Sequence, residues 1–455
     1  MPNLRIERSG AGSPLLCSDL QPSAESGASE KLFSGIISKG YGSPNSLASS
    51  GLQTGRDIMT QHMADIRWFL AADQNSMLGN TSKLVFIVLA LAFPGLSQSS
   101  NDALALEQQG KVAEAADAWR AVTESNPRDA AAFASLGVVL SKQEKYAEAA
   151  QAYKTALVLN PKLPGVQLNL GLAEFKQGHF QLAIAPFSKV LASDPRNVQA
   201  RTLLGMTFYG AGRLTDAIKY LRPAAEADPS NLELRQVLAQ SCLRAKNYSC
   251  AFEEFKSILQ QNPDSAAAHI LLGEALDGLN KTDDAVAEFQ AAAKMAPGEP
   301  DLHFGLGYLY WKLRRYDDAS REFGAELAVD PNHALALAYL GDIALKNNDT
   351  EKAASLLERS IQQKKDVRIA YLDLGTARMD QKQYSAALKA LRRAVGLDPT
   401  QPDAHYRLGR VYQALGNSAD AKREFTKTKT LHQKADDAVV LIRPTPPPST
   451  QQLDK

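Results

Sequence analysis

One spacing dominates this sequence: a Leu-Gly dipeptide returns every 34 residues, from Gly137 to Gly409, with Ala239 replacing the glycine once. Twelve residues after each glycine slot stands an alanine, four residues later a bulky side chain, and a proline closes most units. Proline makes up about 5% of an average sequence, so eight prolines in ten closing slots exclude chance. A fixed period of this length predicts a stack of repeated structural units.

Within one unit the apolar residues form two stripes with helical spacing. Phe133, Leu136 and Leu140 lie three and four residues apart, and a second stripe begins at Ala149 and Tyr153. The small slots let two helix axes approach closely, and the large side chain fills the space beside them. Asn-Pro or Asp-Pro then ends the second helix, because proline cannot continue its hydrogen-bond ladder. The sequence therefore predicts antiparallel helix pairs and an all-α fold.

These filled Leu-Gly, Ala, aromatic and Pro slots resemble those of the tetratricopeptide repeat (TPR) family. The resemblance covers residues 98–435, with a degenerate unit at 96–129. The nine full units begin at residues 130, 164, 198, 232, 266, 300, 334, 368 and 402. The resemblance implies a right-handed superhelical solenoid, in which helix A of each pair lines a concave groove and helix B faces outward. Asp102 stands where leucine is expected, which weakens the prediction for the first helix.

The segment 77–97 has the order of a secretory signal peptide. Lys83 precedes an unbroken apolar run, and the small residues Gly95 and Ser97 fit the sites before a cleavage point, which we expect after Ser97. The alternative is a membrane anchor over 84–96. The apolar run has, however, only about half of the roughly 20 residues that a spanning helix needs, so no stable span is expected in the mature chain.

The two ends of the chain do not follow the repeat. Residues 1–76 are polar and rich in Ser and Gly, which predicts disorder or a true start at Met77. At the other end, residues 436–455 comprise the apolar segment Val439–Ile442, expected to cap the array, and a Pro-rich tail.

Charge and motif content narrow the function classes. Lys and Arg number 51 against 50 Asp and Glu, so no field of one sign favours nucleic acid or an anionic membrane. The sequence lacks H-E-x-x-H, G-x-S-x-G and G-x-x-x-x-G-K, and neither enzymatic activity nor a cofactor is predicted. The expected function is a periplasmic or secreted scaffold that binds a peptide or protein in the groove. The alternatives are an accessory subunit of an enzyme or of secretion or polysaccharide machinery, and a glycan-binding module.

By the same resemblance, positions 2, 5, 9 and 12 of each A helix face the groove. The candidate partner-binding residues there are aromatic or thioether: Phe175, Met206, Tyr209, Phe304, Tyr308 and Trp311. Lys312, next to Trp311, is a further candidate. In the unit 300–333 the three aromatic residues fall at i, i+4 and i+7, and an exposed strip of this kind suits an extended or helical peptide. Core packing of the same rings between adjacent A helices is the alternative.

Two further pairs of residues have side chains that can form a disulfide or bind a metal. Cys242 and Cys250 lie on the two helices of one unit and predict either a disulfide in an oxidising compartment or two small core residues. His269 and His303 occupy equivalent slots of consecutive units. Because the same slot holds Phe133 elsewhere, semi-buried packing is expected there and no metal site is predicted.

Overall fold

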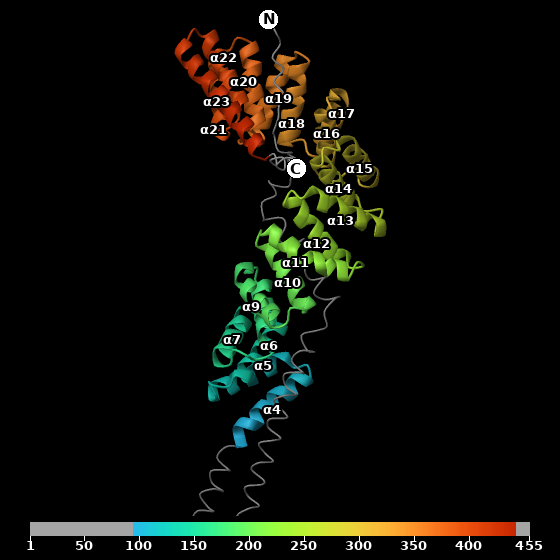
Figure 1. The fold of residues 1–455 in the computed structure, drawn as a ribbon, viewed down its shortest axis with the longest axis vertical. Helices are drawn as coiled ribbons and strands as arrows, with labels where there is room; N and C mark the ends of the chain where they lie inside the picture. Colours follow the sequence, from blue (N-terminus) through green and yellow to red (C-terminus); the bar gives the residue numbers. More distant parts are fainter. Residues whose placement is uncertain (1–93, 443–455) are drawn as a thin grey trace, which may run out of the picture. The chain divides into compact units, whose positions relative to one another are not determined.

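The computed structural model describes residues 94–442, which form twenty α-helices and no strand within that range (Figure 1). The chain divides into two units, with the boundary between Gln261 and Asn262. None of the helices within 94–442 combines the length and the apolar character needed to cross a bilayer. The predictions for 1–76, for the apolar run of the signal segment and for the Pro-rich tail lie outside the described residues.

Each unit consists of five antiparallel helix pairs. The first unit contains α4 (Pro94–Gln108), α5 (Val112–Ser125), α6 (Ala130–Lys142), α7 (Tyr146–Leu159), α8 (Val166–Lys176), α9 (Phe180–Ser193), α10 (Val198–Gly210), α11 (Leu214–Ala227), α12 (Leu232–Arg244) and α13 (Tyr248–Gln261). The second contains α14 (Ala266–Gly278), α15 (Thr282–Met295), α16 (Leu302–Lys312), α17 (Tyr316–Val329), α18 (Ala334–Lys346), α19 (Thr350–Gln363), α20 (Arg368–Asp380), α21 (Tyr384–Leu397), α22 (Pro402–Ala414) and α23 (Ser418–Ile442). The even-numbered helices are the A helices.

The glycine slot and the aromatic slot of the repeat form one packing contact. A Cβ atom added at Gly171 would lie 2.6 Å from Cε1 of Phe187, and one added at Gly307 would lie 2.7 Å from Cδ1 of Phe323. Both rings are fully buried. In these pairs a larger residue in the slot would overpack the core unless the ring moved, whereas the α12–α13 pair accommodates Ala239 with the buried Phe255.

The turn from helix A to helix B has one residue in the left-handed region in every pair. This residue lies seven positions after the glycine slot and is Gly110, Glu144, Gly178, Gly212, Lys246, Asn280, Arg314, Asn348, Lys382 or Gly416. Glycine and asparagine adopt a positive φ at little cost. The turn closes by a backbone bond such as Lys145 N–H to the Leu140 carbonyl, at 3.0 Å. This bond fixes the antiparallel course of each pair.

The degenerate first pair is also helical, despite Asp102. The side chain of Asp102 is exposed, while the next residue, Ala103, is fully buried. Trp119 of α5 donates its indole N–H to Glu107 of α4 at 2.7 Å. These contacts hold α4 on α5, and Pro94–Ser97, the end of the predicted signal segment, form the first turn of α4.

Candidate ligand-binding face

Successive A helices contact one another within each unit. The contacts join α6, α8, α10 and α12 in the first unit and α16, α18, α20 and α22 in the second. Each unit therefore presents one face built from A helices, which we call the A-helix face. The predicted groove positions lie on these helices, and several of their side chains reach the next A helix.

Most of the predicted aromatic strip of α16 is buried. Phe304 is 4% exposed and Tyr308 is 5% exposed, while Trp311 is half-buried. Tyr339 of α18 packs on all three rings, with centroids 6.0 Å from Phe304, 5.7 Å from Tyr308 and 5.0 Å from Trp311. The expectation of an exposed strip therefore does not hold for Phe304 and Tyr308, because the next repeat covers them with an aromatic side chain.

Charged partners surround the accessible end of this strip. Trp311 donates its indole N–H to Asp342 at 2.6 Å, and Lys346 forms an ion pair with the same carboxylate. Lys312, one of the candidate partner-binding residues, bonds Asp277 at 2.6 Å. Both aspartates are buried, so both lysines neutralise carboxylates of the fold.

The candidate residues of the first unit are buried as well. Phe175, Met206 and Tyr209 are all in the core. Phe175 packs edge-on against Phe180 with ring centroids 5.4 Å apart, and the Tyr209 hydroxyl donates to Gln240 of the next A helix at 2.9 Å. Their packing is the core alternative that the sequence left open.

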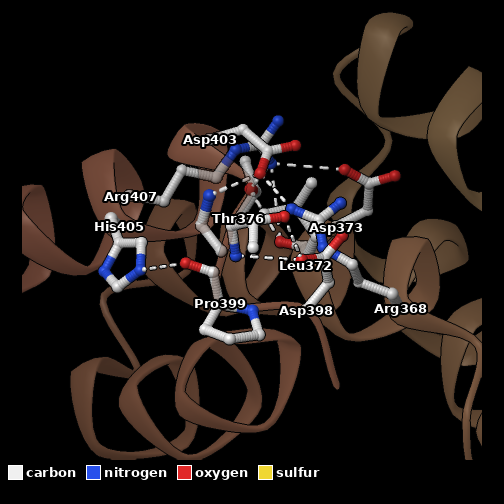
Figure 2. Close-up of polar contacts among 11 residues, drawn as sticks. Arg368, Leu372, Asp373, Thr376, Asp398, Pro399, Asp403, His405 and Arg407 are labelled. Atoms are coloured by element: carbon white, nitrogen blue, oxygen red, sulfur yellow. Dashed lines mark hydrogen bonds and ion pairs between the residues drawn. The ribbon is translucent and has the colours of Figure 1, made fainter. Parts of the chain in front are cut away.

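A guanidinium links the last two A helices (Figure 2). Arg407 of α22 bonds Asp373 of α20 at 3.2 Å and also donates to the Thr376 hydroxyl. Arg368 of α20 reaches back to Asp403 of α22. Asp373 is buried, and charged bonds of this kind are costly to break from one side. The sequence analysis missed this link because the partners lie 34 and 35 residues apart.

The ring nitrogens of His269 and His303 contact protein groups on both sides. Nδ1 of His269 faces Glu288 at 2.5 Å, Nδ1 of His303 faces Glu322 at 2.7 Å, and each Nε2 faces the carbonyl of a proline before its own helix at 3.1 Å. His405 repeats the arrangement with Glu424 and the Pro399 carbonyl, and Figure 2 shows the contact with Pro399. Both ring nitrogens are therefore engaged: Nδ1 contacts helix B of the same repeat, and Nε2 contacts the proline that closes the preceding repeat.

Asp301, Glu326 and His333 place ligand-type atoms within 4.8 Å of one another. Nδ1 of His333 accepts the Ala336 N–H at 3.0 Å, so the ring proton is on Nε2, which donates to Asp301 at 2.9 Å. This bond lowers the pKa of Asp301. A metal-bound histidine normally donates its other ring N–H, which this cap excludes. Glu326 instead accepts the backbone N–H groups of Asp301 and Phe304, at 3.2 and 3.0 Å, and caps α16.

Cys242 and Cys250 are joined as a disulfide between α12 and α13. Their Cα atoms are 5.7 Å apart, within the usual range. Both residues are buried, so the bond is also part of the core of its repeat.

Glu274 lies on α14, the first A helix of the second unit, which the Lys312–Asp277 ion pair joins to α16 of the A-helix face. It is half-buried, yet it makes no hydrogen bond or ion pair with any residue in the described part of the chain. Burial raises the pKa of its carboxyl to about 8. The sequence analysis did not single out Glu274, since neither its burial nor its lack of a partner is visible from residue types.

Solved structures that resemble this chain share little sequence with it. The Cut9–Hcn1 hetero-tetramer of the APC/C is 15% identical over 76% of this chain and 83% of its own, with a TM-score of 0.44. Yeast Tom70 is 13% identical over 76% and 94%, with a TM-score of 0.37. YrrB, described as a TPR protein with an unusual peptide-binding site, is 20% identical over 41% and 96%, with a TM-score of 0.33. Likenesses this distant say nothing of function, and no curated protein matches the chain.

Family models match most of the helical part. Models described as tetratricopeptide repeat match residues 102–164, 168–232, 243–294, 279–325, 304–366 and 403–434, and one described as TPR repeat matches residues 375–416. Together these ranges span more than half of the sequence, and the helix pairs, glycine contacts and turns follow the same 34-residue period. The chain belongs to the tetratricopeptide repeat family, whose arrays are scaffolds for protein–protein interaction.

Proposed function

We propose that this chain is an exported, non-enzymatic scaffold that binds an extended polypeptide on its A-helix face. The observation that carries the proposal is a row of partly accessible side chains, one on each of four successive A helices of the second unit. The row, at position 12 of each repeat, consists of Trp311, Leu345, Met379 and Gln413. Packed helix axes are roughly 8–10 Å apart, and an extended chain advances about 3.3 Å per residue. Three ligand residues would therefore span one step of the row.

Selection from a displayed library of random dodecapeptides tests this surface. Since Phe304 and Tyr308 belong to the core, truncating them would disturb the fold along with any binding, so the accessible row is altered instead. The double variant Met379→Glu/Gln413→Glu should weaken the selected peptides by about tenfold or more, because a hot-spot surface then carries unpaired charge.

The matched control is Lys352→Glu/Lys389→Glu, on the exposed sides of the B helices α19 and α21. It should leave affinity within about twofold, and helical circular dichroism should confirm that both variants fold. Equal loss in both double variants, or no peptide selected by the wild type, would refute the proposed function.

Export is the second part of the proposal. It is supported by the signal-like order of residues 77–97 and by the buried Cys242–Cys250 disulfide, since such bonds persist in oxidising compartments. N-terminal sequencing of the protein from its natural source should find Gln98 as the first residue. A chain that begins at Met1 or Met77 would overturn cleavage after Ser97.

A further inference from the structure

We infer that Glu274 is the anchor for a Lys or Arg side chain of the polypeptide that the A-helix face binds. This inference rests on the proposed function. Glu274 occupies position 9 of helix α14, one of the positions that the TPR resemblance assigns to the ligand. With Glu274 as an anchor, the A-helix face requires a positively charged residue in its ligand, in addition to contacts with its row of accessible side chains.

Two buried carboxylates of the same unit, Asp277 and Glu326, both have hydrogen-bond partners. Asp277, one turn further along α14, is bonded by Lys312 of α16 at 2.6 Å and by Thr282 of α15 at 3.1 Å. Glu326 accepts two backbone N–H groups. Buried polar groups are normally paired, and an exception calls for an explanation. Glu274 is half-buried, and within residues 94–442 it has no hydrogen-bond or ion-pair partner, unlike these two carboxylates.

The same position two repeats later shows which partner is missing. Asp342 occupies position 9 of α18 and forms an ion pair with Lys346, four residues further along the helix. The residue four positions after Glu274 is Gly278, which has no side chain. Helix α14 therefore has no cation four residues after Glu274 like the one that pairs with Asp342 in α18.

Physical chemistry favours a basic ligand group at this point. The only resolved cause of the raised pKa of Glu274 is burial, so its ionised form lacks a compensating charge. Asp277 is itself an acid and cannot supply a positive charge. The Lys312 ammonium already forms an ion pair with Asp277. An ammonium or guanidinium group placed against Glu274 would gain a charge-assisted hydrogen bond in a partly dry site.

The random dodecapeptide library tests the inference when selected at pH 8 on the full chain and on three variants. Peptides selected by the wild type should be enriched in Lys or Arg at one register. Glu274→Gln should abolish this enrichment and weaken the wild-type peptides about tenfold. Gly278→Lys, which supplies an internal cation at i+4, should do the same while keeping the carboxylate. Glu253→Gln, an exposed carboxylate on the B helix α13, should change neither.

The outcomes separate this inference from the function on which it rests. Peptides that bind the A-helix face without any basic enrichment, or whose enrichment survives in Glu274→Gln, would overturn the role of Glu274 and leave the scaffold proposal standing. A wild type that selects no peptide would overturn both. Replacing Lys by norleucine in a selected peptide should reproduce the loss seen with Glu274→Gln, and an unchanged affinity would contradict the inference.

Discussion

Replacing Glu274 with glutamine is expected to stabilise the second unit by about 3 kcal/mol at pH 9 and to change little near pH 4. Burial raises the pKa of this carboxyl from 4.5 to about 8. The folded state thus holds the proton more tightly than the unfolded state, and stability falls as the pH rises from 4.5 to 8. At about 1.4 kcal/mol per pKa unit the ceiling is about 5 kcal/mol, which partial contact with water reduces.

Urea unfolding at pH 4 and pH 9, monitored through hydrogen exchange of the α14 amides, measures this effect. A repeat array need not unfold in one step, so a local probe is more informative than a global midpoint. Glu253→Gln is the matched control and should be neutral at both pH values. A gain that does not depend on pH would show that Glu274 is not a buried, unpartnered carboxyl. A gain in stability with a loss of ligand is typical of a residue kept for function.

The reverse effect is expected at Glu326. Glu326→Ala should cost about 3 kcal/mol, because two backbone N–H groups of α16 lose their acceptor and the Phe304 N–H is buried. Glu326 is 1% exposed, so water cannot easily replace it. The carboxylate also lies at the positive end of the α16 dipole, where a negative charge is favoured.

Glutamine at position 326 should have an intermediate effect on stability. Glu326→Gln keeps one acceptor oxygen and should lose about half as much as alanine. Glu351→Ala, at an exposed position in the first turn of α19, should lose well under 1 kcal/mol. Hydrogen exchange at the start of α16 measures the two Glu326 variants, and exchange at the start of α19 measures Glu351→Ala. If Glu326→Ala were as stable as the wild type, the carboxylate would not be the cap of α16.

Much of the fold could be predicted because the repeat carries its own packing rules. The Leu-Gly and aromatic slots predicted the helix pair, and the structure brings Gly307 and Phe323 together as one contact. Even the degenerate unit is helical, since Ala103 next to Asp102 still packs in the core. A 34-residue period fixes which residues of one pair meet, because those contacts are local in sequence.

The face could be predicted only in outline, because its chemistry depends on contacts between repeats. Burial of Phe304 and Tyr308 follows from Tyr339. The residue at this position varies from repeat to repeat, as Ser135, Leu203 and Gly305 show. Lys312 was a candidate partner-binding residue by its place next to Trp311, but in the structure it forms an ion pair with Asp277. Each case needs a register between two A helices, which single-repeat patterns do not contain.

The footprint of a selected peptide on the full chain tests the central claim, that the A helices bind polypeptide. Hydrogen exchange at saturating peptide should slow at amides of α16, α18, α20 or α22 near the row of Trp311, Leu345, Met379 and Gln413. The exposed sides of α17, α19 and α21 should not change. Protection confined to those B helices, with none on the A helices, would contradict the account.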